Sequence, residues 1–517
     1  MRATSDWEYA ITTKLVILLI YLGSLMFVGW LASRRVKDTR DYFAAGKGIG
    51  FWSAAFSARA TGESAWLLLG LTGMGAAVGL KAMWVVAGEV LGVGLAWMLM
   101  AKRFKRLTDQ YDAITVPEYL EERFGDKSHL LRCVAALTLV VFVTIYVGAQ
   151  VDATGKAFES FLGWNYYTGA LVGYFVVLVY IITGGFLAVV WSDVIQGVLM
   201  FVGLTVLPLW ALVHAGGLAP IEDSLQQIDP SLLSFSGAEG WTLATILGVI
   251  AFFGIGFGFL GSPQIFVRYL ALRSEREVGR GATVAIVWTV LADSGAVLTG
   301  LFGRALLTGP DDDLNAVLGQ SGQEVLPLLV EHLFPLVIVG IFVAVVLSAI
   351  MSTIDSLLVV ASSAVVRDWY QKTRRPDLAD DALTGLARKA TFALATIALV
   401  IALIVAVLSP DRTVFWFVIF GWSGIACTFC PTIILSLFWS GFTRAGALSA
   451  MITGFVCVPL FKFGIYRIPG WGEQLAPLEE MVPAFLLSFL VGFVVSVARP
   501  ESAERRDAVR RELDSAK

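Results

Sequence analysis

The sequence predicts an all-α membrane protein with about thirteen transmembrane helices. Apolar residues make up 57% of the 517 residues and charged residues only 15%, whereas a soluble globular domain has about 25% charged residues. Apolar runs of about 20 residues recur along the chain, and each is long enough to cross a hydrocarbon core about 30 Å thick. Basic residues gather in alternate gaps between these runs. These three observations favour a bundle of membrane-spanning helices.

The predicted spans follow the apolar runs in order. The first run is followed by Arg34 and Arg35 without a small-residue cleavage site, so we expect a retained span rather than a signal peptide. Residues 1–498 then form a single transmembrane domain, and residues 499–517 form a short charged cytoplasmic tail, expected to be a solvated helix. The spans cover residues 14–33, 51–76, 82–101, 131–157, 166–183, 187–213, 241–265, 281–304, 333–366, 388–408, 414–439, 446–463 and 481–498.

The gaps that are rich in Lys and Arg predict the orientation, because short cytoplasmic loops retain these residues. The odd-numbered gaps carry them, whereas residues 215–240 contain no Lys or Arg and residues 311–313 are all Asp. We therefore expect the N-terminus outside and the C-terminus in the cytoplasm. The basic residues of the odd gaps include Arg34, Arg35, Lys37, Arg40, Lys47, Lys102, Arg103, Lys105, Arg106, Arg268, Arg273, Arg276, Arg280, Arg367, Lys372, Arg374 and Arg375.

Several functional classes are disfavoured by what the sequence lacks. It has no G-x-x-x-x-G-K-[ST] motif, which argues against direct ATP hydrolysis. It shows no pore-type selectivity loop, which argues against an ion channel. The four cysteines, Cys133, Cys427, Cys430 and Cys457, lie in or beside apolar runs, where a disulfide framework or a zinc site is not expected. A transporter driven by an ion gradient, or a sensor built on such a fold, remains.

Two predicted spans are interrupted by small and polar residues. Residues 56–66 of the second span contain Ser, Thr, Gly and Glu, and residues 252–263 of the seventh contain four glycines and a terminal proline. Unwound backbone exposes carbonyls to a cation and amides to an anionic group, and interrupted helices at corresponding positions are typical of inverted-repeat transporters. Glycine-rich helix crossings are the alternative interpretation of each break.

The ninth predicted span carries a stripe of side-chain oxygens. Ser352, Asp355 and Ser356 share one helical face at spacings of three and four, with Ser348 a turn below. Hard cations take oxygen ligands, and an ionisable residue inside a membrane costs roughly 2.5–3.5 kcal/mol, so it tends to mark an ion path. Hydroxyls that bond their own helix are the alternative, but they leave Asp355 unexplained. For Asp193, near the start of the sixth span, the alternative is an acid that stabilises a helix N-terminus.

Three stretches resemble the sodium/solute symporter family and, within it, the bacterial sodium/proline symporters. They are residues 184–193, residues 348–356 with their continuation to 364, and residues 66–71. The resemblance runs from Asp41 to about Leu448. It implies a LeuT-type core of two inverted five-helix repeats, about 51–213 and 241–439, together with sodium coupling and a location in a bacterial inner membrane.

The resemblance also implies the site residues. Its main sodium site would use carbonyls of Ala60, Glu63 and Ala349 with the hydroxyls of Ser352 and Thr353. Some relatives have a second sodium site, which here would use Asp193, Ser352, Asp355 and Ser356, so one or two sodium ions per cycle are expected. The solute pocket is expected between the two breaks. Its candidate lining residues are Thr61, Gly62, Ser64, Tyr146, Gln150, Ile255, Phe259 and Trp422.

The sequence departs from the proline symporters at both breaks. They read A-S-D-M-S-G-W where residues 60–66 here read A-T-G-E-S-A-W, and they carry Trp and Tyr where this chain has Ile255 and Phe259. Arg59, Glu63 and Glu89 form a further set of membrane charges. These three either pair with one another, which we favour, or contact a charged solute.

The sequence therefore predicts a sodium-coupled secondary symporter, not an enzyme, that imports a small organic solute by alternating access. An amino acid such as proline is the first candidate, and a monocarboxylate, a sugar or another solute is the alternative. A nutrient sensor on a transporter core is a further alternative, disfavoured because the tail is too short for a fused kinase. The expected partners are the solute, sodium and the lipid bilayer, with no nucleic acid, and nothing in the sequence requires more than a monomer.

Overall fold

The computed structural model describes residues 2–35, 39–181, 185–375, 377–378 and 380–516. These residues form helices joined by short loops, which confirms the predicted all-α membrane fold. Three predicted features lie outside the described residues: Lys37, Gly184, and residues 182–183 at the end of the fifth span.

Within the described ranges, eleven helical segments are long and apolar enough to cross a membrane. One of them, Phe51–Gln110, is a 60-residue run that covers two of the predicted spans, and α9 (Tyr166–Ile181) is too short to be included. The number thirteen therefore stays a prediction. The eleven segments are Tyr9–Ser33, Phe51–Gln110, Leu130–Leu162, Gly185–His214, Leu243–Leu260, Glu275–Leu307, Leu336–Arg374, Ala382–Leu408, Val414–Phe438, Arg444–Arg467 and Met481–Ala498.

The 60-residue run changes direction at Gly79, which separates α4 (Thr72–Val78) from α5 (Met83–Leu95). Gly79 has φ +60°, and a Cβ there would lie 2.0 Å from the carbonyl oxygen of Leu232. Only glycine fits this conformation and this close approach. The remaining pieces of the run are α3 (Phe51–Ala65), the π-helical η2 (Trp66–Leu71), the 3-10 turn η3 (Gly79–Ala82), the π-helical η4 (Ala96–Ala101) and α6 (Lys102–Gln110).

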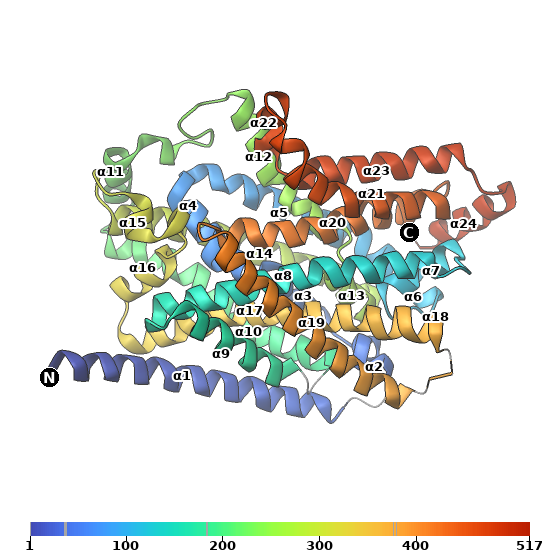
Figure 1. The fold of residues 1–517 in the computed structure, drawn as a ribbon, viewed down its shortest axis with the longest axis horizontal. Coiled ribbons are helices and arrows are strands. Elements are labelled where there is room, and N and C mark those ends of the chain that lie inside the picture. Colours follow the sequence, from blue (N-terminus) through green and yellow to red (C-terminus); the bar gives the residue numbers. More distant parts are fainter. Residues whose placement is uncertain (1, 36–38, 182–184, 376, 379, 517) are drawn as a thin grey trace.

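The long helices lie side by side, and the two ends of the chain lie at opposite ends of the bundle (Figure 1). Short helices such as α11 and α15 lie at the end that holds the N-terminus, and α7 and α24 lie at the other. The remaining helices are α1 (Arg2–Ser33), α2 (Thr39–Ala44), α7 (Val116–Phe124), α8 (Leu130–Leu162), α10 (Gly185–His214), α11 (Leu218–Ile228), α12 (Leu243–Gly254), α13 (Pro263–Ala271), α14 (Val278–Leu307), α15 (Leu314–Leu318), α16 (Val325–Leu333), α17 (Leu336–Ser363), α18 (Lys372–Arg374), α19 (Asp380–Leu408), α20 (Val414–Phe438), α21 (Arg444–Phe463), α22 (Trp471–Leu475), α23 (Met481–Ala498) and α24 (Ala503–Ser515).

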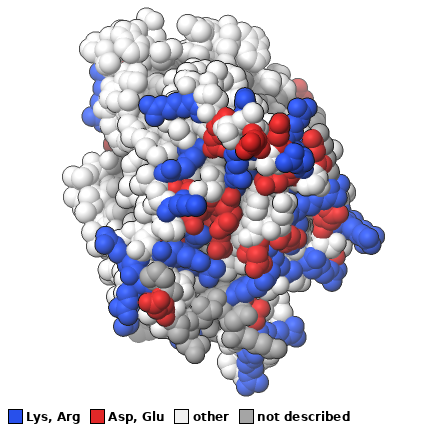
Figure 2. All heavy atoms as spheres, turned by 90° about the vertical axis from the view of Figure 1, so that its right-hand side faces the viewer, with Lys and Arg blue, Asp and Glu red and all other residues white. Residues whose placement is uncertain are grey.

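The end of the bundle that holds the C-terminus is densely charged. Figure 2 shows Lys, Arg, Asp and Glu side chains gathered on this face. Ion pairs join neighbouring segments here, including Arg132 of α8 with Asp368 at 2.8 Å and Arg444 of α21 with Asp126 at 2.9 Å. The side of the membrane on which this end lies stays a prediction.

The tail forms the expected helix, α24, but one of its faces is packed rather than solvated. Val509 and Leu513 are buried against the bundle. The hydroxyl of Tyr111 donates a hydrogen bond to Glu512 at 2.8 Å, and Arg505 donates one to the carbonyl of Arg123 at 3.2 Å. The tail is thus a mostly solvated helix with one packed face, because two apolar side chains one turn apart give the charged helix a docking face.

Candidate functional site

The first interruption lies at the end of α3, where Ser64 has φ +41° and ψ −167°. This conformation is costly for a residue with a Cβ, by roughly 1–3 kcal/mol, and such strain is often found at functional sites. Side chains of α8 hold the break: Gln150 donates to the hydroxyl of Ser64 at 3.2 Å and accepts from the backbone N–H of Ala65 at 3.0 Å. Tyr146 also donates to Ser64 at 3.4 Å. The predicted interruption is confirmed.

The second interruption separates α12 from α13 through a 3-10 segment, η6 (Ile255–Leu260). A Cβ on Gly256 would lie 2.0 Å from the carbonyl of Gly88 on α5, and one on Gly258 would lie 2.2 Å from the ring of Trp422 on α20. Glycines are therefore needed here for close packing as well as for the break. Pro263 then begins α13, where its missing N–H costs nothing.

Two hydroxyls of α17 meet the backbone of the first break. Ser352 donates to the carbonyl of Ala60 at 2.9 Å and to that of Ala349 at 3.1 Å, and Thr353 donates to the carbonyl of Thr61 at 3.0 Å. All five residues are buried. The structure thus brings together four of the five residues predicted for the main sodium site, and it adds the carbonyl of Thr61.

Glu63, the fifth predicted residue, lies one turn further along α3. Its carbonyl accepts the backbone N–H of Trp66. Its carboxylate forms an ion pair with Arg59, which also approaches Glu89 at 3.2 Å and Asp293 at 3.7 Å. Mutual pairing of Arg59, Glu63 and Glu89 is therefore confirmed. Asp293 was missed, although a lone acid within the apolar span 281–304 was the signal that could have found it.

Two of the four residues predicted for a second sodium site, Asp193 and Ser356, contact a buried arginine. Arg268 of α13 donates to Asp193 at 3.0 Å, to Ser356 at 2.5 Å and to Thr61 at 2.7 Å. Its Nε donates to Ser57 at 3.0 Å, and Ser57 donates to Asp193 at 2.5 Å. A guanidinium thus lies in the oxygen stripe where a sodium ion was expected.

The other two residues predicted for the second site do not contact this arginine through a hydrogen bond in the described structure. Ser352 bonds the first break, and the carboxylate of Asp355 accepts the backbone N–H of Ser356 at 2.7 Å. Both side chains are buried, with no exposed surface.

Arg268 corrects the sequence interpretation, which counted it among the basic residues of a cytoplasmic loop. It is fully buried. The predicted seventh span ended at residue 265, whereas α13 continues to Ala271 and carries Arg268 inward. The predicted span included Pro263 but not the half-helix of nine residues that this proline begins.

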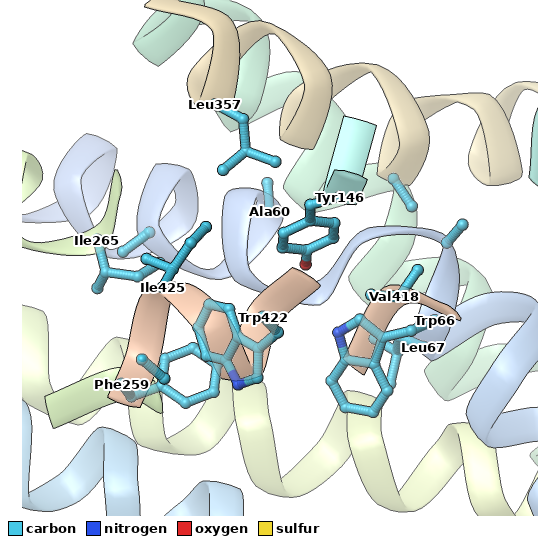
Figure 3. Close-up of a cluster of buried hydrophobic side chains, with 14 of the residues drawn as sticks. Ala60, Trp66, Leu67, Tyr146, Phe259, Ile265, Leu357, Val418, Trp422 and Ile425 are labelled. Carbon is cyan, nitrogen blue, oxygen red and sulfur yellow. The ribbon is translucent and has the colours of Figure 1, made fainter. Parts of the chain in front are cut away.

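Three of the candidate solute-lining residues, Tyr146, Phe259 and Trp422, belong to one cluster of buried side chains (Figure 3). Trp422 donates its indole N–H to the carbonyl of Ile255 at 3.1 Å, and its ring lies 5.1 Å from Phe259 and 6.4 Å from Tyr146. A Cβ on Gly62 would lie 2.7 Å from the ring of Phe259. Tyr146 links these rings to polar atoms, because its hydroxyl donates to that of Ser64, which Gln150 also contacts. Small-molecule sites combine such apolar walls with a few placed polar groups.

Comparisons with known proteins agree with this architecture. Residues 42–454 match the sodium:solute symporter family. The high-affinity proline transporter PutP of Bacillus subtilis is 35% identical over 92% of this chain and 95% of its own length. The sodium/proline symporter of Escherichia coli is 32% identical over 94% of this chain and 92% of its own length.

Solved structures share the fold. A Na⁺-coupled sialic acid symporter in a substrate-bound, outward-open state matches 95% of this chain and 99% of its own, with a TM-score of 0.74 at 17% identity. A closed nucleobase-cation-symport-1 family transporter matches 91% of this chain and 98% of its own, with a TM-score of 0.50 at 13% identity. These similarities support the predicted transporter fold with interrupted helices.

Proposed function

Because this chain belongs to the sodium:solute symporter family, we propose that it imports an amino acid, proline in the first place, together with sodium by alternating access. The proline transporters that it resembles match it over more than nine tenths of its length. The observation that carries the proposal is the contact of the Ser352 and Thr353 hydroxyls with the carbonyls of the broken helix α3.

The main sodium site would use these same atoms. The hydroxyls of Ser352 and Thr353 can turn their lone pairs to a cation, while the carbonyls of Ala60 and Ala349 face it as further oxygen ligands. The carbonyl of Glu63 keeps a second lone pair beside its bond from Trp66 and can complete the set. Sodium would then join α17 to the broken helix α3 and stabilise the arrangement in which these two helices are in contact.

At the site predicted for a second sodium ion, Arg268 would supply the positive charge that Asp193 requires. The cycle would then use one sodium ion in total, bound at the main site. A second ion would bind only if the guanidinium moved away from Asp193 and Ser356. The arginine compensates the charge of Asp193 and joins α13 to α10 and α17.

The solute would lie between the breaks, against the aromatic side formed by Phe259, Trp422 and Tyr146. Its polar groups would face Ser64 and Gln150, which bond each other, while Gln150 also accepts the backbone N–H of Ala65 at the break. A small zwitterion with an apolar ring suits this division into an aromatic and a polar side. Tyr146, Phe259 and Trp422 are each at most 3% exposed, so the helices have to separate before a solute enters.

Uptake into proteoliposomes tests this function. With an inward sodium gradient, radiolabelled proline should accumulate above the level reached with potassium in place of sodium, and unlabelled solutes that share the site should reduce it. The competitors should include other amino acids, monocarboxylates and sugars. Accumulation of a labelled sugar or monocarboxylate instead of proline would change the solute assignment, and uptake that ignores sodium would contradict the mechanism.

The proposed orientation is tested by labelling from one side. In the full chain, a cysteine introduced at Ser234, in the outer loop, should react with an impermeant maleimide added to intact cells. A cysteine introduced at Ser502, before α24, should react only after the membrane is opened. The four native cysteines are replaced first, and each labelling variant is checked for proline uptake. The reverse pattern would contradict the orientation that the basic residues predict.

A further inference from the structure

A second group of buried charges lies beside the candidate solute site and has no part in the mechanism above. Arg59 and Glu63 of α3 meet Glu89 of α5 and Asp293 of α14. The four side chains are at most 1% exposed. One oxygen from each carboxylate lies within 4.8 Å of the others. Three helices therefore bring three acids to one point inside the bundle.

The positive charge at this point is too small for the acids around it. Three carboxylates and one guanidinium leave two negative charges uncompensated when all are ionised. Keeping an uncompensated ion in a protein interior costs several kcal/mol. Arg59 reaches the acids through a single nitrogen, Nη2, while its guanidinium carbon lies 4.8 Å from the ring centre of Phe259 and 5.4 Å from that of Trp288.

The acids also lack hydrogen-bond donors. Oε1 of Glu63 contacts Nη2 of Arg59. Among the described residues, no hydrogen bond reaches either oxygen of Asp293, Oε2 of Glu63 or Oε1 of Glu89. Buried polar atoms are nearly always hydrogen-bonded, so a group of unsatisfied oxygens needs an explanation, such as an ion. Asp293 is the clearest case, because it is fully buried and lies 3.7 Å from the nearest nitrogen of Arg59.

We propose that Glu63, Glu89 and Asp293 bind a hard metal cation, sodium or calcium, at a site separate from that of Ser352 and Thr353. Such ions prefer carboxylate oxygens, and a calcium ion lies about 2.3–2.6 Å from each ligand. Two ligands of one such ion are then at most about 4.6–5.2 Å apart, and these oxygens lie within 4.8 Å of one another. A sodium ion would remove one excess negative charge, and a calcium ion both.

The site would couple the ion to the broken helix. Glu63 directly precedes Ser64, whose backbone makes the break, whereas Glu89 and Asp293 lie on the long helices α5 and α14. Phe259 lies between Arg59 and Trp422, so the cluster adjoins the solute-lining rings without being among them. A bound cation would fix the end of α3 to α5 and α14 and thereby stabilise the turn that Ser64 makes.

Ion binding to the purified full-length chain tests the proposal without a transported solute. Equilibrium binding of ²²Na⁺ and, separately, of ⁴⁵Ca²⁺ is measured for the parent and for the Glu89→Gln/Asp293→Asn double variant. That variant keeps the Arg59–Glu63 pair and removes the two excess charges. We expect the parent to bind one more ion per chain than the double variant: a loss confined to ²²Na⁺ assigns sodium, and one confined to ⁴⁵Ca²⁺ assigns calcium.

Two further variants make the result specific. Glu480→Gln neutralises another buried acid, which pairs with Lys462 at 3.2 Å, and should bind as many ions as the parent. Ser352→Ala/Thr353→Ala should still bind the ion of the acid cluster. This variant leaves the cluster residues unchanged, so the number of ions that it binds tests the proposal even if the Glu89→Gln/Asp293→Asn variant does not fold. The proposal would be overturned if a folded Glu89→Gln/Asp293→Asn variant bound as many sodium and calcium ions as the parent. It would also be overturned if Ser352→Ala/Thr353→Ala bound no ion.

Discussion

Replacing Ser352 and Thr353 together by alanine is expected to raise the sodium concentration for half-maximal proline uptake by about 100-fold or more. A bond to a charged group contributes about 1.5–3 kcal/mol, and each 1.4 kcal/mol is about a factor of ten in affinity. Both hydroxyls lie against the broken helix, so losing them removes two of the oxygen ligands and the hydrogen bonds that they donate to the carbonyls of Ala60 and Thr61. Initial uptake rates over a sodium titration measure the effect.

The matched control is Thr289→Ala on α14. Thr289 is also buried, but its hydroxyl donates to the carbonyl of Ala285 in its own helix at 2.8 Å. We expect this variant to keep the sodium dependence of the parent. If Ser352→Ala/Thr353→Ala responds to sodium as the parent does, these hydroxyls join helices and bind no ion.

Replacing Arg268 by glutamine is expected to lower the free energy of unfolding by about 3–5 kcal/mol, as when one partner of a buried ion pair is removed. Asp193 would then be left in the interior without its cation, and Ser57, Thr61 and Ser356 would each lose a donor. Thermal unfolding in detergent, followed by tryptophan fluorescence, should show a large fall in Tm, and proline uptake should fall with it.

A second substitution should restore much of this loss. In Arg268→Gln/Asp193→Asn the charge that needed compensation is gone, so the double variant should be more stable than Arg268→Gln alone, a non-additive result typical of contacting residues. Arg273→Gln is the surface control, because its side chain is 61% exposed, and its effect should stay within about 0.5 kcal/mol. A stable Arg268→Gln variant would show that Asp193 does not depend on this guanidinium.

The fold class and the two interruptions followed from local features of the sequence. A membrane core offers no hydrogen bonds to an exposed backbone, so long apolar runs have to be helices. The glycines and Pro263 of the seventh span predicted its break, and the spacing of Ser352, Asp355 and Ser356 predicted a polar stripe, because helical periodicity is known in advance. The resemblance to a known family then indicated which backbone carbonyls face the polar stripe.

The partners of these groups were decided by tertiary structure. Ser352 and Thr353 meet the carbonyls of Ala60 and Thr61, and Asp193 meets Arg268, from segments between 75 and 292 residues apart in the chain. Asp293 joins Arg59 in the same way. Successive residues of a helix point about 100° apart, so a small difference in where α3 breaks, or in where α13 begins after Pro263, brings a different side chain to the site. Local sequence determines which helices have polar faces, but only the packing of the bundle determines how each helix is turned and which charges meet.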